Sequence, residues 1–499
     1  MMQFNWAAKN ALYFGDKLAI REFESGRSVS YNDLERLSEY YSNKFVEMGC
    51  GYGDRIGIIS ENRIEHFILF FVCQKLGTIL VPINHRLAAP EISYIINDST
   101  PKYILAEDKF RTKFESTWHN NLISLEKCEQ EWNTEADNAL FENRLSSPSL
   151  TENSAIFILY TSGTTGNPKG ALYTHKMLFW NSINTQMRLE ISSTDHSISV
   201  MPLFHTGGWN VIPTPYLHRG ASVTLMKKFD PDVLLKQLAE ESVTMLVAVP
   251  TMIQMITESP VFNSTELPGL RFLIIGGEPL PVDLIEVWQK KGIPVRQGYG
   301  LTEAGPSITS LHQDYAFSKR GSIGFPNFYV NYKIVDDEMM EVAVGERGEL
   351  LLNGPSVSPG YWGKEAPDYS ENRWLSTGDI VVSDSEGFLS IVDRKKNMFI
   401  SGGENVYPAE VEKVLNQHPF IKEVAVIGVP DERWGEAGKA FIVFNNVSEL
   451  TEKDLTEHCK SKLASYKVPK SFVFLPELPK NDTGKINRKL LQHINQQSH

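Results

Sequence analysis

The sequence is poor in cysteine and contains no long hydrophobic run. Its four cysteines, at positions 50, 73, 128 and 459, are widely separated, and no Cys-x-x-Cys pair occurs. This spacing argues against a disulfide framework or a zinc site and favours a reducing compartment. The apolar stretch from Phe67 to Cys73 is far too short to span a bilayer, and no secretory signal is visible. We therefore expect no integral membrane segment and a cytoplasmic location.

The sequence also lacks a basic block. Lys and Arg total 49 against 61 Asp and Glu, which gives a formal net charge of −12. A mildly acidic chain argues against nucleic acid as the main partner. The 12 histidines show no metal-ligand spacing. With 499 residues, 41% of them hydrophobic, the chain is long enough for two to four domains with large cores, and we expect a soluble enzyme.

Short β-like runs alternate with helical runs along most of the chain. Near the N-terminus the pattern predicts a strand at 55–59, a helix at 63–76, a strand at 78–81, a helix at 88–96 and a strand at 103–105. Further along it predicts a strand at 222–225, a helix at 231–241, a strand at 245–249, a helix at 251–258 and a strand at 271–275. This alternation is typical of an α/β domain with a largely parallel sheet. Residues 133–151 are polar and poorly periodic, which predicts a connecting loop.

The character of the sequence changes near residue 393, where the charged run 393–397 separates two apolar segments. The remaining residues resemble a small α+β unit. They predict a helix from Pro408, strands at 423–429 and 440–444, and a helix to about residue 463 opened by a capping box of Thr451 and Asp454. We therefore predict a large N-terminal domain of packed α/β subdomains at 1–394 and a small C-terminal domain at 395–499.

Residues 160–170 form a loop rich in hydroxyl groups and glycine, with the sequence Tyr-Thr-Ser-Gly-Thr-Thr-Gly-Asn-Pro-Lys-Gly. An apolar run at 156–159 precedes it and a helix-like stretch at 172–187 follows it. A strand, a Gly-rich turn and a helix start predict an anion cradle, because backbone N–H groups and the helix dipole converge there. The pattern differs from a Walker A loop, since Lys169 is followed by Gly170. The alternative is a flexible surface turn, which this composition disfavours.

Four other motifs carry groups suited to a nucleotide. In 297–303, two glycines would let the backbone approach a ligand, Tyr299 offers a flat face, and Glu303 offers a hard carboxylate of the kind that Mg²⁺ prefers. Asp379 lies in a turn at 376–379 and could accept both hydroxyls of a ribose. The remaining two motifs are a strand-end turn at 276–279 and an aromatic segment at 201–209 that contains His205. Each motif alone is weak evidence for a nucleotide site. The evidence is stronger because all four motifs follow the phosphate loop in order.

Taken together, these motifs resemble those of the adenylate-forming superfamily, which contains acyl- and aryl-CoA synthetases, peptide-synthetase adenylation domains and luciferases. They occur in the family's order from Tyr160 to Lys485, and the N-terminal alternation also fits. The resemblance implies a large N-terminal domain, a mobile C-terminal lid and an active site between them. It identifies Lys396 as the hinge position.

The resemblance also implies roles for individual residues. The residues expected at the ATP phosphates are Thr161, Ser162, Gly163, Thr164, Thr165, Gly166 and Lys169. Those expected at the adenine are Gly277, Glu278, Pro279 and Tyr299, and those at the ribose are Asp379 and Arg394. The expected catalytic residues are Lys485, Thr302, Glu303 and His205, with Glu303 holding Mg²⁺. Many family members carry a small residue in place of Glu278, whose carboxylate either points outward, which we favour, or alters substrate preference.

The implied activity is ATP-dependent ligation of a carboxylic acid to a thiol through an acyl-AMP. Gly402, Gly403 and Trp434 match positions that border the pantetheine of CoA in related ligases, so CoA is the expected acceptor. The alternatives are a stand-alone enzyme that loads a carrier protein, a binding protein that has kept the fold, and a luciferase. We also consider a homodimer.

The residues expected to line the acyl pocket are apolar and include no internal cation. They are Trp209, Val211, Ile212, Val249, Met252, Gly277, Gly300 and Ala304. Such a pocket favours a hydrophobic acid, fatty or aryl, over an amino acid, whose ammonium group would need a buried carboxylate. The expected context is fatty acid and lipid metabolism.

Overall fold

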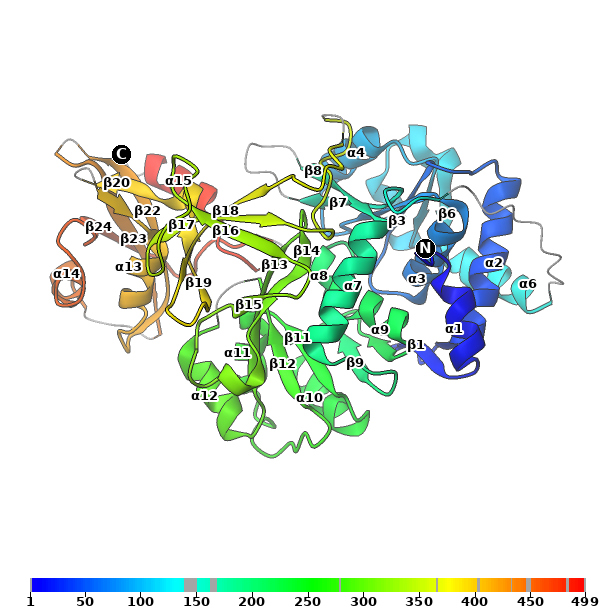
Figure 1. Ribbon diagram of the computed structural model, residues 1–499, viewed down its shortest axis with the longest axis horizontal. Helices are drawn as coiled ribbons and strands as arrows, with labels where there is room; N and C mark the ends of the chain where they lie inside the picture. Colours follow the sequence, from blue (N-terminus) through cyan, green and yellow to red (C-terminus); the bar gives the residue numbers. More distant parts are fainter. Residues whose placement is uncertain are drawn as a thin grey trace. The chain divides into compact units, whose positions relative to one another are not determined.

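The computed structural model describes residues 2–138, 150–161, 168–277, 280–364, 367–401, 404–431, 433–445, 450–481 and 484–497. The chain folds into two compact units (Figure 1). The first comprises Met1–Asn331 and Leu352–Leu375, and the second comprises Tyr332–Leu351 and Ser376–His499. The predicted domain boundary after residue 394 stays a prediction; in the structure, the strands that carry Asp379 and Arg394 group with the second unit.

A nine-stranded sheet forms one half of the first unit. Its order is β15-β14-β13-β12-β11-β9-β10-β1-β2, and the strands from β13 to β1 run parallel. The strands are β1 (Leu18–Glu22), β2 (Ser28–Ser30), β9 (His196–Ser199), β10 (Ser222–Leu225), β11 (Met245–Ala248), β12 (Phe272–Ile275), β13 (Val295–Leu301), β14 (Gly305–Ser310) and β15 (Phe325–Pro326). Antiparallel strands β14 and β15 close one edge.

A six-stranded sheet forms the other half, in the order β6-β5-β3-β4-β7-β8. The strands are β3 (Arg55–Ile59), β4 (Ile79–Ile83), β5 (Tyr103–Ala106), β6 (Leu122–Ser124), β7 (Ala155–Thr161) and β8 (Lys169–Thr174). All neighbours are parallel except β7 and β8, which pair antiparallel. Crossover helices join the parallel strands, so the expected α/β class is confirmed.

The helices of the first unit begin and end close to the predicted positions. They are α1 (Trp6–Phe14), α2 (Tyr31–Glu47), α3 (Ile64–Leu76), α4 (Ala89–Ser99), α5 (Leu125–Lys127), α6 (Asn133–Asn138), α7 (His175–Leu189), α8 (Thr206–Asn210), α9 (Pro213–Arg219), α10 (Pro231–Glu240), α11 (Pro250–Glu258) and α12 (Val282–Lys290). The prediction of a loop at 133–151 is wrong at its start, because residues 133–138 form helix α6, which packs against α2. Tyr41 of α2 donates a hydrogen bond to Asn133, which anchors this short helix despite its polar sequence.

Helix α3 lies in the centre of the first unit, and every one of its residues is buried. It contacts β1 of the nine-stranded sheet and β4 and β7 of the six-stranded sheet. One hydrophobic core therefore includes side chains from both sheets and from α3. A helix that is apolar on all sides is stable only inside a protein, so the sequence of α3 requires elements to cover it on every face.

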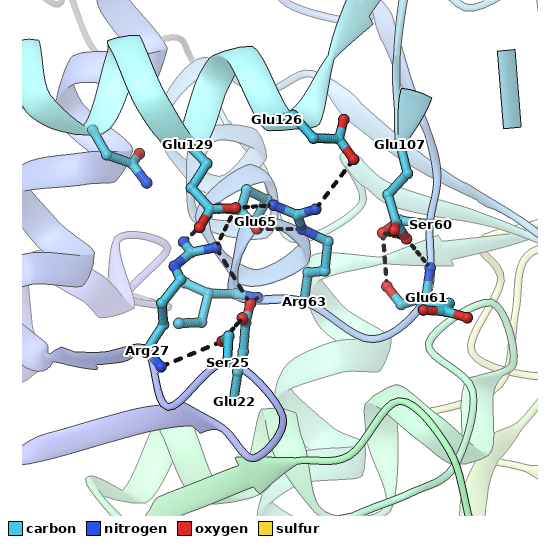
Figure 2. A network of polar contacts seen from close by, with 12 residues as sticks. Glu22, Ser25, Arg27, Ser60, Glu61, Arg63, Glu65, Glu107, Glu126 and Glu129 are labelled. Carbon is cyan, nitrogen blue, oxygen red and sulfur yellow. Dashed lines mark hydrogen bonds and ion pairs between the residues drawn. The ribbon is translucent and has the colours of Figure 1, made fainter. Parts of the chain in front are cut away.

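The charged residues of α3, Glu65 and Lys75, form ion pairs. Glu65 is fully buried and accepts from Arg27 Nη2 at 2.6 Å and from Arg63 Nε at 3.0 Å (Figure 2). Glu129 binds both of these arginines, which completes the network. Burial alone would raise the pKa of Glu65, but the two guanidinium groups outweigh it and hold the pKa below its ordinary value.

The second unit contains a four-stranded sheet and a smaller α+β body. The strands of the first sheet are β16 (Asn331–Val335), β17 (Arg347–Asn353), β18 (Leu375–Ser383) and β19 (Leu389–Arg394). The body contains β20 (Phe399–Ser401), β21 (Glu404–Val406), β22 (Ile421–Asp431), β23 (Gly435–Phe444), β24 (Ser471–Phe474), α13 (Pro408–Leu415), α14 (Glu452–Lys460) and α15 (Arg488–Gln497). The capping box of Thr451 and Asp454 is confirmed at the start of α14. Among the residues that the structure describes, every helix is too short or too polar to cross a bilayer.

Replacing Glu65 by alanine should lower the free energy of unfolding by about 3–5 kcal/mol, because the buried Arg63 and the half-buried Arg27 lose a shared, fully buried carboxylate. Urea denaturation followed by tryptophan fluorescence measures the change. The matched control is Glu240→Ala, which removes an exposed pair with Lys236 at 3.8 Å and should cost less than about 1 kcal/mol.

The difference between wild type and Glu65→Ala should also depend on pH. Because the folded pKa of Glu65 is lowered, its contribution is complete above its ordinary pKa of 4.5 and is lost as the pH falls through the folded value. An equal loss of stability in both variants at neutral pH would contradict the role assigned to this network.

Candidate active site

The phosphate loop connects two antiparallel strands, which differs from the expected arrangement. Thr161 ends β7 and Lys169 begins β8, and the two residues are paired across the hairpin. The helix predicted at 172–187 begins only at His175, with Thr174 as its N-cap. The alternating sequence 169–174 therefore forms a strand, and the N-terminus of α7 lies a full strand away from the loop along the chain. The helix dipole expected in the anion cradle is not supplied by this helix.

Lys169 and Glu303 lie on either side of a tyrosine. The Lys169 ammonium lies 5.4 Å from the centre of the Tyr361 ring, and the Tyr361 hydroxyl donates to Glu303 Oε1 at 2.8 Å. Tyr361 pairs with Ala171 of β8, which fixes its backbone beside the loop. Burial and the Glu303 carboxylate raise the pKa of Tyr361, so its proton stays available for this bond. Sequence reasoning missed Tyr361, which lies far from both residues in the chain.

The hairpin β13–β14 carries three of the expected site residues. Tyr299 lies on β13 and is buried, while Thr302 and Glu303 in the connecting turn are half-buried. Gly300 was expected to let a ligand approach, but a Cβ there would lie 2.3 Å from the Pro306 backbone. The glycine is therefore required by the hairpin itself.

His205 lies immediately before α8 and is held there by the core. Trp209 of the same helix is fully buried, donates to the Leu203 carbonyl and packs on Phe67 and Phe157. The expectation that Trp209 lines the acyl pocket is therefore wrong, because its ring fills the core beside α3. His205 is half-buried next to Phe204, with ring centroids 4.6 Å apart.

A pocket opens beside the strand ends of the nine-stranded sheet. Its apolar lining includes Leu189, Val211, Val247 and Ile274, and its rim includes Gly276 and Gly298. Val211, one of the residues expected to line the acyl pocket, lines this pocket. Ile212 packs into the core and Val249 is the N-cap of α11, whereas Val247 of β11 lines this pocket. Arg188 from the end of α7 also lines this pocket, so a cation lies beside its apolar side chains.

In the second unit, Asp379 and Arg394 face each other on neighbouring strands. They are paired in the register of β18 and β19, and Arg394 Nε lies 3.0 Å from Asp379 Oδ1. Asp379 is 3% exposed, whereas half of the Arg394 side chain is exposed. The pair presents a carboxylate and a guanidinium together, a combination suited to a polyhydroxyl group.

Asp393 fixes the segment that contains the expected hinge Lys396. One carboxylate oxygen of Asp393 accepts from the Arg394 and Asn397 nitrogens, and the other accepts from the backbone N–H of Ala409 in the first turn of α13. Asp393 therefore joins β19, the short helical turn at Lys395–Asn397 and α13. The sequence showed only a charged run at this place.

The remaining expected residues of the second unit lie on turns. Lys485 is exposed, and two hydrogen bonds join it to Asn481. The backbone N–H of Lys485 donates to the Asn481 side-chain oxygen, and the backbone N–H of Asn481 donates to the Lys485 carbonyl. Trp434 is half-buried, and Arg433 and Lys470 lie 5.0 and 5.4 Å from its ring. The expected site residues that lie outside the described residues are Ser162, Gly163, Thr164, Thr165, Gly166, Glu278, Pro279, Gly402 and Gly403.

The carboxylate of Glu303 fits a magnesium ion. Its Oε1 accepts from Tyr361, and no described residue donates to the other oxygen. Across the described ranges, His, Cys, Asp and Glu side chains form no group of three or more that could hold a metal. Mg²⁺ commonly binds through one or two carboxylates together with substrate phosphates, so a single Glu beside a phosphate loop suffices.

Comparisons with known proteins agree with this geometry. The model of the AMP-binding enzyme family matches residues 7–362, and that of the AMP-binding enzyme C-terminal domain matches residues 410–485. The chain is 34% identical to a feruloyl-CoA synthase from Amycolatopsis sp. over 97% of its length and 96% of the relative. It is also 34% identical to the long-chain-fatty-acid–CoA ligase FadD13 of Mycobacterium tuberculosis, over 93% of the chain and 92% of that protein.

Among solved structures, the o-succinylbenzoate CoA synthetase (MenE) of Bacillus subtilis with its acyl-adenylate intermediate superimposes with a TM-score of 0.86. The two proteins are 30% identical, and 98% of each chain is covered. The chain therefore belongs to the AMP-binding enzyme family. The expected superfamily, fold class and acyl-CoA synthetase type are confirmed.

Tyr361→Phe should lower kcat/KM about tenfold and raise the Mg²⁺ concentration needed for half-maximal rate. The variant loses one hydrogen bond to a charged group, which orients Glu303. Pyrophosphate release at a series of Mg²⁺ concentrations measures both effects. Tyr369→Phe, which changes an exposed tyrosine of the same segment, is the matched control. An unchanged Mg²⁺ dependence in a folded Tyr361→Phe enzyme would contradict the positioning role of Tyr361.

Proposed function

We propose that this chain joins a carboxylic acid with a hydrophobic body to CoA, using ATP and forming an acyl-AMP intermediate. The observation that carries the proposal is the arrangement of Lys169, at the end of the phosphate loop, with Tyr361 and Glu303. It provides a cation for phosphate oxygens and a carboxylate for Mg²⁺ in the unit that also contains an apolar pocket.

In the first half-reaction, a carboxylate oxygen of the acid attacks the α-phosphorus of ATP, and pyrophosphate leaves. Both reactants are anionic, so positioning and charge neutralisation provide the catalysis, and no nucleophilic side chain is needed. Lys169 binds the phosphates, and Lys485 offsets the repulsion between the carboxylate and the α-phosphate. Thr302 lies beside the α-phosphate, and His205 borders the reacting carboxylate. Glu303 would hold Mg²⁺, which would supply positive charge to stabilise the leaving pyrophosphate.

Two groups of residues are proposed for the nucleoside. Tyr299 and Gly277 border the adenine, and the pair Asp379–Arg394 binds the ribose hydroxyls. The carboxylate of Asp379 accepts from hydroxyl groups, and its ion pair with Arg394 orients it.

In the second half-reaction, the thiol of CoA attacks the acyl carbonyl carbon and AMP leaves with its electron pair. Trp434 borders the pantetheine together with Gly402 and Gly403, and Lys396 is the pivot between the two half-reactions. The alternative acceptor is the thiol of a carrier protein. A cytoplasmic location and a homodimer are further parts of this proposal.

The purified enzyme should release AMP in a CoA-dependent manner when it is given a panel of fatty and aryl acids. AMP release measures activity, and varying first the acid and then the acceptor identifies both substrates. Omitting CoA should leave only about one equivalent of pyrophosphate per enzyme, since the acyl-AMP stays bound. A carrier protein that supports turnover where CoA does not would replace CoA as the acceptor. No AMP release with any acid or acceptor would refute the proposal.

Lys485→Ala should lower acyl-AMP formation about 100-fold or more, while thioester formation from supplied acyl-AMP stays largely intact. The ammonium group is needed only where the carboxylate and the α-phosphate meet. Each half-reaction is measured separately, by pyrophosphate release and by thioester yield. Lys480→Ala is the matched control, because it removes a lysine of the same segment that pairs with Glu423. Equal losses in both half-reactions of a folded Lys485→Ala enzyme would refute the assignment.

A further inference from the structure

Helix α4 lies against the hairpin that carries the phosphate loop. Its side chains Ile92, Ile95 and Ile96 belong to one hydrophobic cluster with Ile158 of β7 and Leu172 of β8 (Figure 1). Strand β8 is an edge strand of the six-stranded sheet. The position of this hairpin therefore depends on contacts from outside the sheet as well as on strand pairing within it.

Asp98, the penultimate residue of α4, makes two contacts with the surroundings of the loop. Its Oδ2 accepts from the Tyr160 hydroxyl at 2.5 Å, and its carbonyl accepts from the Trp362 indole N–H at 3.1 Å. Tyr160 is the penultimate residue of β7, at the entry to the loop, and Trp362 directly follows Tyr361, whose hydroxyl donates to Glu303. Asp98 therefore holds both the strand that enters the loop and the segment that holds the expected magnesium ligand.

The same segment is joined to the exit of the loop. The backbone N–H of Trp362 donates to the Gly170 carbonyl at 2.7 Å. Gly170 pairs with Tyr160 across the hairpin, and a Cβ on Gly170 would lie only 3.2 Å from Cζ of the Tyr160 ring. The Tyr160 ring therefore lies against the residue that follows Lys169, so a movement of Tyr160 would be transmitted to Lys169.

Arg55 of β3 fixes the end of α4 on which Asp98 lies. Its Nε donates to the Ser99 carbonyl at 2.9 Å, and its Nη2 donates to the Thr100 carbonyl at 2.8 Å. Its guanidinium also lies 5.4 Å from the centre of the Trp362 ring. Because β3 pairs with a strand on each side within the six-stranded sheet, these bonds tie Asp98 to the body of the unit.

We propose that Asp98 is a positioning residue that sets the phosphate loop for the triphosphate of ATP. The carboxylate acts through the Tyr160 hydroxyl, and the carbonyl acts through Trp362. Together the two contacts fix the separation between Lys169 and Glu303, the cation for the phosphates and the carboxylate for Mg²⁺. A small displacement of either group weakens binding of a ligand that needs both. This inference rests on the proposed function, which assigns the loop to ATP.

A purely structural role is the competing explanation for the bond between Asp98 and Tyr160. Burial and the Asp98 carboxylate raise the pKa of Tyr160, so the hydroxyl keeps its proton, and a bond to a charged acceptor stabilises the fold. A structural bond would change the melting temperature and affect all nucleotides alike. A bond that positions the loop affects ATP in particular, because AMP lacks the β- and γ-phosphates.

The test compares the binding of ATP and of AMP by calorimetry, in the presence of Mg²⁺ and without an acid. Asp98→Ala and Tyr160→Phe should each weaken ATP binding about tenfold and leave AMP binding within about twofold of wild type. Asp98→Asn keeps an acceptor oxygen for Tyr160 and should bind ATP nearly as wild type does. The double variant should lose no more ATP affinity than either single variant, because both changes remove the same bond.

The matched controls are Tyr40→Phe and Glu135→Ala, which remove another tyrosine–carboxylate hydrogen bond, between α2 and α6. Both should leave ATP and AMP binding unchanged. A second readout is the pair of half-reactions: Asp98→Ala should slow pyrophosphate release, while thioester formation from supplied acyl-AMP stays largely intact. If Asp98→Ala does not fold, Tyr160→Phe and Asp98→Asn decide the question.

The two proposals fail in different ways. A selective loss of ATP binding in Asp98→Ala, with a wild type that releases no pyrophosphate with any acid, would refute the proposed function and support the role of Asp98. Acyl-AMP formation by wild type, with equal losses of ATP and AMP binding in Asp98→Ala, would support the proposed function and overturn this inference. Unchanged ATP binding in folded Asp98→Ala and Tyr160→Phe would also overturn it.

Discussion

The burial of helix α3 is the constraint on which the first unit depends. All of its side chains are buried, so strands of both sheets and neighbouring helices must cover it. Two of its polar residues then need partners inside the protein. Glu65 finds them in Arg27 and Arg63, and Lys75 finds them in Glu35 and Glu39 of α2, at 2.7 and 2.9 Å. These ion pairs set the position of α3 along its axis, which apolar contacts alone do not specify.

The same core positions the candidate active site. Trp209 packs on Phe67 of α3, and this contact places α8 and the preceding His205 at the edge of the core. The parallel strands of the nine-stranded sheet end on one side, where the turns after β12 and β13 carry Gly277 and Glu303. Ligands commonly bind at the carboxyl ends of parallel strands, because loops from distant parts of the chain meet there.

Particular residues show which parts of the fold and of the candidate site could be predicted from the sequence. Strand and helix positions agreed closely where periodicity was strong, as at 222–225 and 231–240. The prediction was wrong after the phosphate loop, because the residues of β8 also fit a helix and only pairing with β7 selects the strand. Asp379 and Arg394 were identified by motif, and the structure adds that they face each other on adjacent strands. Tyr361 was missed, since no local pattern reveals a contact with a residue 58 positions away.

The sequence by itself determined the alternation of strands and helices, the motifs and their order, and hence the family and the type of chemistry. These properties are local or shared by relatives, so they can be read from neighbouring residues. Only the tertiary structure decided which side chains meet. Trp209 could have lined the pocket or filled the core, and Arg188 could have been a surface residue of α7. The physical reason is that burial and pairing are set by distant segments, and a sequence pattern does not show which segments will face each other.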